Sequence, residues 1–139
     1  MQQLSAQDAS FLYRELPATP MHVGSLSIYD GTHADPARLT EEAILKAVAE
    51  RLHLAVTTRR KCVRVPMEAD YPYWVEDQDF DLEYHVRRIG LPKPADWNEL
   101  KKLTARVYSH PLDMSKPLWE FYIIEGLNSG HLAGVEHRT

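Results

Sequence analysis

Histidine side chains are the groups in this 139-residue chain best suited to acid–base or metal chemistry, and the sequence contains seven of them. The tightest grouping is His131, Glu136 and His137, which offers two imidazoles and one carboxylate. Zinc sites usually contain closely spaced ligand pairs on a fixed scaffold, and this grouping lacks them, so we expect no metal site. His85 lies in a predicted extended segment, Tyr84–Val86, where a partly buried, hydrogen-bonded histidine is more common than a catalytic one.

Nucleophilic and nucleotide chemistry find little support in the sequence. Cys62 is the only cysteine, so no intrachain disulfide can form, and we expect it to be a buried apolar side chain. No G-x-S-x-G nucleophile elbow occurs, and neither of the common glycine-rich phosphate loops is present. Two groups of aromatic residues could line an apolar substrate channel, although core packing is their more common role. These residues are Tyr71, Tyr73, Trp74, Trp119, Phe121 and Tyr122.

Composition limits the class of protein. Hydrophobic residues make up 44% of the chain and charged residues 26%, as in soluble globular proteins, and the length suits one domain or part of one. The net charge is -4, and no basic stripe is present that would bind nucleic-acid phosphates. The longest apolar run, Phe121–Ile124, is far shorter than the roughly 20 residues that span a bilayer. The first residues lack the features of a signal peptide, so we expect a cytoplasmic protein.

The first half of the chain predicts mixed α and β structure. A short helical segment, Asp8–Leu16, ends before a proline-rich stretch that begins at Pro17. Alternating apolar residues predict a strand over His22–Tyr29, which the turn signal Asp30-Gly31 ends. The clearest helix follows Thr40, which can cap its N-terminus. The apolar face of this helix carries Ile44, Leu45, Val48 and Leu52.

The second half of the chain predicts short strands and one further helix. Leu118–Ile124 is the most strand-like run, and the turn Gly126–Gly130 should start a hairpin after it. The sequence predicts a return strand only over His131–Val135. We therefore expect a folded part over residues 1–135 and a tail over residues 136–139. The acidic run Glu76–Asp79 is expected to be a solvated loop. The other expected elements are strands over Arg59–Val65, Tyr73–Val75 and Tyr84–Val86, and a helix capped by Asp96 with Leu100, Leu103 and Val107 on one face.

Five segments form an ordered series through the chain. They are Leu4–Leu12, Pro20–Gly24, Phe80–Val86, Leu91–Pro94 and His110–Glu120. In order and spacing they resemble the bacterial wax ester synthase/diacylglycerol acyltransferase family. The Pro117-Leu118-Trp119 element is the most specific match, and the resemblance covers essentially the whole chain.

This resemblance implies a fold and a reaction. The implied fold is that of the CoA-dependent acyltransferases similar to chloramphenicol acetyltransferase, a two-layer α/β sandwich with a mixed sheet and packed helices, of which this chain would form the first subdomain. Family members transfer a long acyl chain from acyl-CoA to the hydroxyl of a diacylglycerol or a fatty alcohol, in triacylglycerol and wax ester synthesis. Acyl-CoA is then a co-substrate, and no cofactor is implied. A histidine of the family's H-H-x-x-x-D-G motif takes the alcohol proton, a role typically worth about 10²–10⁴ in rate.

The sequence departs from the family at that motif. It contains no His-His pair, and its only Asp-Gly, Asp30-Gly31, lies in the wrong place. His137 is followed by Arg138, so no catalytic role is carried over to it. We therefore expect no catalytic residue in a chain truncated before the motif and lacking the second subdomain. The Pro117-Leu118-Trp119 element is expected to give structural support beside the substrate channel, with its tryptophan buried.

Three hypotheses remain. The first is the N-terminal part of an acyl-CoA-dependent O-acyltransferase, a transferase by family but inactive alone. The second is a non-catalytic acyl- or lipid-binding module that keeps an apolar groove without the base. The third is a degenerate reading frame whose tail from Glu136 belongs to no fold. We expect a cytoplasmic protein that binds no nucleic acid, with peripheral contact to the inner face of the plasma membrane or to a lipid droplet as the family's alternative.

Overall fold

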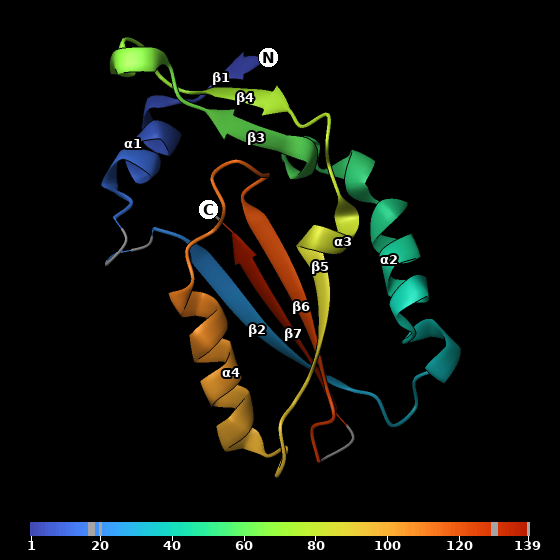
Figure 1. The fold of residues 1–139 in the computed structure, drawn as a ribbon. Helices are drawn as coiled ribbons and strands as arrows, with labels where there is room; N and C mark the ends of the chain where they lie inside the picture. The colour runs from blue at the N-terminus through green and yellow to red at the C-terminus, as the bar shows by residue number, and fades with distance from the viewer. Residues whose placement is uncertain (17–18, 20, 129–130, 139) are drawn as a thin grey trace.

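A four-stranded mixed sheet forms the centre of the molecule (Figure 1). The computed structural model describes residues 1–16, 19, 21–128 and 131–138. The strands lie in the order β2 (Val23–Asp30), β7 (His131–Arg138), β6 (Trp119–Glu125) and β5 (Val86–Gly90). β7 runs antiparallel to both of its neighbours, and β5 runs parallel to β6. The mixed sheet with packed helices confirms the expected α/β class.

A smaller antiparallel sheet crosses one end of the central sheet (Figure 1). Its strands lie in the order β1 (Gln2–Gln3), β4 (Tyr73–Glu76) and β3 (Arg60–Val63). The helix α1 (Ala6–Arg14) lies beside this sheet, and the Ser5 hydroxyl caps it by accepting from the N–H of Asp8 at 3.1 Å. Cys62 is buried here, as the sequence predicted, and burial raises the pKa of its thiol. The cluster at this end consists of Leu4, Ala9, Leu12, Cys62, Leu112 and Leu118.

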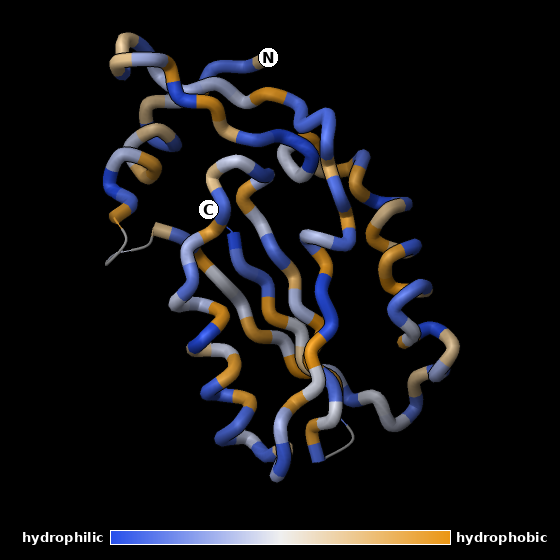
Figure 2. Tube along the Cα trace, viewed as in Figure 1, coloured by the Kyte–Doolittle hydropathy of each residue, from blue (hydrophilic) through white to orange (hydrophobic). Residues whose placement is uncertain are grey.

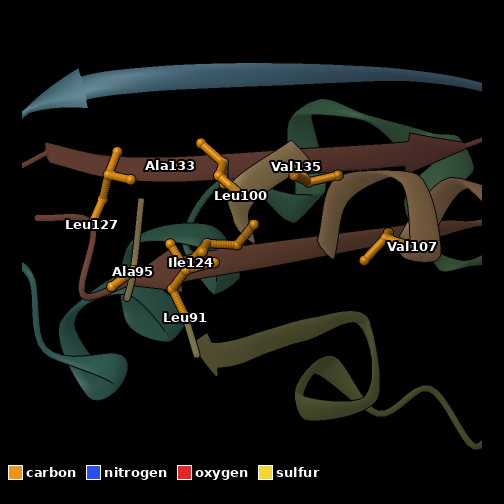
Figure 3. Close-up of a cluster of buried hydrophobic side chains, with 8 residues drawn as sticks. All are labelled: Leu91, Ala95, Leu100, Val107, Ile124, Leu127, Ala133 and Val135. Atoms are coloured by element: carbon orange, nitrogen blue, oxygen red, sulfur yellow. The ribbon is translucent and has the colours of Figure 1, made fainter. Parts of the chain in front are cut away.

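The helix α4 (Trp97–Ser109) covers one face of the central sheet. It begins where predicted, because the Asp96 carboxylate accepts from the N–H groups of Asn98 and Glu99 at 2.9 and 3.0 Å. The predicted residues Leu100 and Val107 are buried against the sheet. Figure 3 shows this main core, which contains Leu91, Ala95, Leu100, Val107, Ile124, Leu127, Ala133 and Val135.

The opposite face of the sheet is covered differently. Because side chains alternate along a strand, Trp119 and Phe121 of β6 point away from α4. The helix α2 (Glu41–Ala49) stands on this side, and the Thr40 hydroxyl caps it by accepting from the N–H of Ala43 at 3.2 Å. Hydrophobic residues recur along α2 (Figure 2), yet none of its residues is buried. Its apolar face therefore does not pack tightly on the sheet.

Short helices complete the described part of the chain. The expected strand over Tyr84–Val86 is wrong at its start, since the Asp81 carboxylate accepts from the N–H of Glu83 at 3.0 Å and caps one helical turn. β5 begins only at Val86. The short helices are η1 (Pro36–Arg38), η2 (Leu52–Leu54), η3 (Val56–Arg59), η4 (Pro66–Glu68) and α3 (Leu82–His85).

The return strand β7 is longer than predicted. It continues through Glu136 and His137 to Arg138, which pairs with Val23 of β2 on one side and Trp119 of β6 on the other. The expected tail over residues 136–139 is therefore wrong for residues 136–138, because a strand from the other end of the chain supplies their hydrogen-bond partners. Thr139, the end of the expected Gly126–Gly130 turn and most of the proline-rich stretch after Leu16 lie outside the described residues.

The prediction that the acidic run Glu76–Asp79 is a solvated loop is also partly wrong. Asp77 is buried, and its Oδ1 lies 2.8 Å from Nζ of Lys61, which sits on the neighbouring strand β3. The hydrogen bond from Lys61 lowers the pKa of the Asp77 carboxyl below its usual range. Within the described part of the chain, no helix combines the length and the hydrophobicity needed to cross a membrane.

Candidate functional site

A hollow of about 810 Å³ lies between α2 and the face of the central sheet that α4 leaves open. We call it the α2 hollow and define it by Ile44, Val48, Leu52, Trp74, Trp119 and Phe121. Its volume lies within the range of small-molecule sites, which are mostly apolar and carry few polar groups. Its lining is largely apolar, so it suits an aliphatic ligand.

One wall of the α2 hollow comes from α2 itself. Ile44 and Val48 lie one helical turn apart on the predicted apolar stripe, and Ala47 lies beside them. The sequence therefore predicted this stripe correctly, but the stripe faces the hollow and not a closed core. Such a wall can move more easily than a packed one, because few neighbours hold it.

The facing wall contains Trp119 of the predicted Pro117-Leu118-Trp119 element. Pro117 and Leu118 are buried, whereas Trp119 is half-buried, less than expected, because it also borders the hollow. The indole Nε1–H donates to the carbonyl oxygen of Thr58 at 2.8 Å. This element thus connects the central sheet to the segment after α2.

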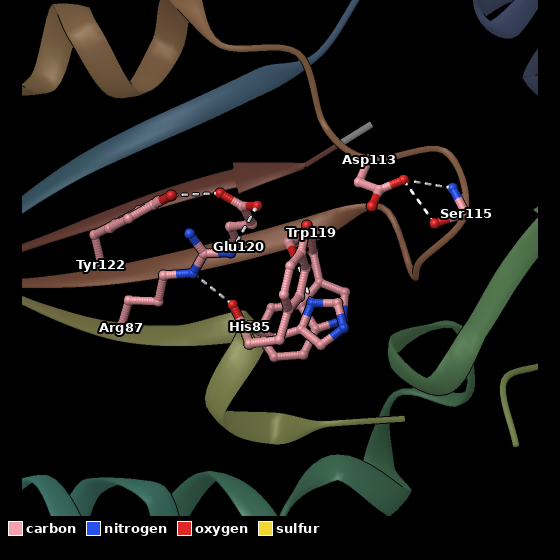
Figure 4. A network of polar contacts seen from close by, with 8 residues as sticks. His85, Arg87, Asp113, Ser115, Trp119, Glu120 and Tyr122 are labelled. Carbon is pink, nitrogen blue, oxygen red and sulfur yellow. Dashed lines mark hydrogen bonds and ion pairs between the residues drawn. The ribbon is translucent and has the colours of Figure 1, made fainter. Parts of the chain in front are cut away.

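His85 lies behind Trp119 and is fully buried (Figure 4). Its Nδ1 lies 2.7 Å from the carbonyl oxygen of Trp119, and since a carbonyl only accepts, Nδ1 carries the proton. The imidazole stacks on the Trp119 indole with ring centroids 4.5 Å apart, and on the ring of Phe80 at 5.1 Å. Burial lowers the pKa of His85 below its usual range. The predicted hydrogen bond is confirmed, and the burial of His85 is complete and not partial as predicted.

A polar network holds the start of β6 from the other face of the sheet (Figure 4). The Tyr122 hydroxyl donates to Oε2 of Glu120 at 2.6 Å, and Nη2 of Arg87 lies 3.6 Å from Oε1 of the same carboxylate. Burial and the Glu120 carboxylate raise the pKa of Tyr122 to about 12. The guanidinium of Arg87 also lies over the ring of Tyr84, 4.6 Å from its centroid. These groups are already paired with one another, so they fix the strand and are not available to a ligand.

A second group of buried polar side chains lies between β2, β7 and α4. The rings of His22 and His137 meet edge to face with centroids 3.8 Å apart, and Nε2 of His22 donates to the carbonyl oxygen of Tyr108 at 2.8 Å. Burial, and then the neighbouring His22, lower the pKa of His137 to about 4. A Cβ at Gly24 would lie 2.1 Å from the Tyr108 ring, so this position needs glycine. His137 points to α4 and away from the hollow.

Sequence reasoning missed the role of His22, which it placed in a predicted strand and in a family segment but not in a buried polar group. The pairing of Gly24 with His137 brings His22 close to His137. This register is set by the folded sheet and cannot be read from the sequence. The sequence also offered six aromatic residues as a channel lining. Trp74, Trp119 and Phe121 do line the hollow, whereas Tyr71, Tyr73 and Tyr122 are not among its lining residues.

The chemistry available inside the α2 hollow is limited. Its charged lining residues are Asp8, Arg38, Arg51, Glu136 and Arg138. Among the described residues, no histidine or cysteine borders the hollow. Over the same residues, no three His, Cys, Asp or Glu side chains lie close enough together to hold a metal ion. The lining is thus suited to an apolar group, and the described residues around it offer no imidazole to move a proton.

Comparison with known proteins finds relatives that are similar in sequence. The family model of the wax ester synthase/diacylglycerol acyltransferase catalytic domain matches residues 4–137. The probable diacylglycerol O-acyltransferase tgs3 of Mycobacterium tuberculosis is 45% identical over 130 residues, which make up 94% of this chain and 47% of that protein. The putative diacylglycerol O-acyltransferase Rv3087 of the same organism is 35% identical over 135 residues, 97% of this chain and 28% of that protein. The chain thus spans about half the length of the first relative, or less for the second.

Solved structures show the same fold. The wax ester synthase/diacylglycerol acyltransferase from Marinobacter aquaeolei VT8 superposes with a TM-score of 0.78 at 26% identity, covering 99% of this chain and 34% of that one. The starter condensation domain of rhizomide synthetase, solved with C8-CoA, superposes with a TM-score of 0.67 at 15% identity, covering 99% of this chain and 30% of that one. The expected acyltransferase subdomain fold is therefore confirmed.

Proposed function

Because this chain belongs to the wax ester synthase/diacylglycerol acyltransferase family, we propose that it provides the acyl-binding part of an acyl-CoA-dependent O-acyltransferase. The acceptor would be the hydroxyl of a diacylglycerol or a long-chain alcohol, and the product a triacylglycerol or wax ester. Acyl-CoA is a co-substrate here, and the reaction needs no further cofactor. The observation that carries the proposal is the apolar α2 hollow beside the Pro117-Leu118-Trp119 element.

The hollow suits the acyl chain better than the other parts of the substrates. An acyl chain is apolar along its whole length, and each methylene group removed from water contributes about 0.8 kcal/mol. The CoA moiety carries phosphates, which must stay near water and near cations. Arg38, Arg51 and Arg138 border the hollow and can attract such anions at its openings.

The reaction needs a base that accepts the alcohol proton, and this requirement limits what the chain can do by itself. In the reaction the alcohol oxygen attacks the thioester carbonyl carbon, the C–S bond breaks, and the alcohol proton passes through a base to the departing CoA thiolate. A base must lie within hydrogen-bond reach of that hydroxyl. Since no histidine of the described residues borders the hollow, we infer that these residues bind the acyl donor without supplying an imidazole base.

Acyl binding without transfer is therefore the second candidate function. The observation that favours it is the same hollow, apolar in its lining and without a histidine among the described residues around it. A binding module of this kind would act at lipid surfaces or carry acyl groups in the cytoplasm. Both functions predict no product from this chain in an acyl-transfer assay, so product formation would exclude acyl binding without transfer.

The first experiment measures binding of hexadecanoyl-CoA to the purified chain by isothermal titration calorimetry. Ala47→Trp places a large ring in the hollow, whereas Ala49→Trp adds the same ring on α2 outside the hollow lining. We expect Ala47→Trp to weaken binding roughly tenfold or more, the equivalent of about two buried methylene groups, and Ala49→Trp to leave it unchanged. Equal affinities for both variants would show that the chain binds elsewhere.

A further inference from the structure

The two walls of the α2 hollow differ in how firmly they are held. On one side, none of the residues of α2 is buried, so Ile44 and Val48 can shift with little loss of packing. On the other side, Trp119 is fixed by contacts from three directions. An acyl chain that enters the hollow can therefore displace α2 more easily than Trp119.

Trp119 is backed by a stack of rings. Its indole lies on the imidazole of His85 at an interplanar angle of 17°, and that imidazole lies on the ring of Phe80 at 13°. The guanidinium of Arg59 closes the stack, 5.7 Å from the centroid of the Phe80 ring. His85 has no exposed surface, so the indole has no empty space behind it into which to move.

Hydrogen bonds also fix the indole within its own plane. Its Nε1–H donates to the carbonyl oxygen of Thr58, and His85 holds the Trp119 backbone through Nδ1. Rotating the indole out of the wall would break the part-buried hydrogen bond to the Thr58 carbonyl oxygen, a loss that folded proteins avoid. Trp119 is therefore the rigid wall of the hollow, and His85 is the residue that positions it.

From this difference we propose that the Trp119 indole, positioned by His85, sets the length of the acyl chain that the α2 hollow accepts. The inference rests on the proposed function, since it takes the occupant to be an acyl chain. Each methylene group that enters the hollow improves the dissociation constant roughly fourfold. Once the chain meets the fixed indole, further methylene groups stay in water and add nothing. Affinity should thus rise with chain length and then level off.

The test measures dissociation constants for acyl-CoA thioesters from octanoyl to eicosanoyl in two-carbon steps. The wild-type chain should reach a limiting length beyond which affinity no longer improves. Trp119→Ala should move this limit to longer chains, with a gain of roughly sixteenfold for each additional two-carbon step. Trp97→Ala, which removes a tryptophan of α4 outside the hollow lining, should leave the limit unchanged.

Two milder variants keep the inference testable if Trp119→Ala does not fold. Trp119→Phe keeps an aromatic wall but loses the bond to Thr58, and His85→Ala removes the ring behind the indole. Both should extend the limiting length while leaving the affinity for octanoyl-CoA within a factor of about two, which a general loss of structure would not do. A limiting length that is the same in all folded variants would overturn the inference but leave the proposed function standing. Failure of the wild-type chain to bind any acyl-CoA would overturn the proposed function itself.

Discussion

Acidification should destabilise this protein through His137. The imidazole is 1% exposed, and its pKa falls from the ordinary value of 6.5 to about 4 in the folded chain. A lowered pKa means that folding disfavours the charged form, so the stability is fully present above pH 6.5 and is lost as the pH falls towards 4. One pKa unit corresponds to about 1.4 kcal/mol. The free energy of unfolding should therefore decrease by about 2 kcal/mol at pH 5 and by about 3 kcal/mol below pH 4 from this residue alone.

The groups around His137 support this sign. His22 faces it from the start of β2 and adds a second imidazole, while Tyr108 faces it from α4. Glu120 is its cross-strand partner on β6, but that carboxylate already accepts from Tyr122 and pairs with Arg87. No carboxylate is thus available nearby to stabilise an imidazolium at this position among the described residues.

The assay is urea unfolding followed by circular dichroism at pH 7 and pH 5. Other groups, including His85 and Asp77, also contribute to the pH dependence, so the informative quantity is the difference between variants. His137→Leu should lose about 2 kcal/mol less than the wild-type chain between the two pH values, whereas His53→Leu, at an exposed position, should behave like the wild type. Parallel loss in the wild type and His137→Leu would refute the reasoning.

Three further predictions concern packing, charge and activity. Gly24→Ala should destabilise the chain by about 1–3 kcal/mol, measured by urea unfolding, because the new Cβ would clash with the Tyr108 ring; no change in midpoint would contradict this contact. Lys61→Ala should lower the urea midpoint because it leaves the buried Asp77 carboxylate unpaired, whereas Lys102→Ala, at an exposed pair, should lower it much less; equal losses would show that the Asp77 site is solvated. Incubation with radiolabelled hexadecanoyl-CoA and either hexadecanol or dioleoylglycerol should give no product above the blank, although a full-length family enzyme does; product formation would mean that the chain holds a base outside the hollow lining.

Local signals allowed much of the fold to be predicted from sequence. Thr40 and Asp96 cap the predicted helices because a cap involves only the next three residues. The strand β6 follows from its own aromatic and β-branched residues. These elements depend on residues close in sequence, so they can be predicted without knowledge of the tertiary structure.

The features that could not be predicted depend on distant neighbours. Asp77 is buried because β3 brings Lys61 beside it, and an acidic run gives no sign of that partner. Glu136 and His137 belong to the sheet because β2 pairs with them from the other end of the chain. The family resemblance singled out Trp119 and predicted that it is buried, but it is only half-buried, because α2 stands away from the sheet.

The pairing of β2 with β7 also determines the order in which the molecule can fold. β2 lies near the start of the chain and finds no strand partner other than β7 within the described residues. During synthesis, therefore, the backbone groups of β2 that pair with β7 have no strand partner until β7 has left the ribosome. Contacts between such distant segments form slowly, because a long loop must close first. Until β7 pairs with it, the β2 edge is open to pairing with other chains.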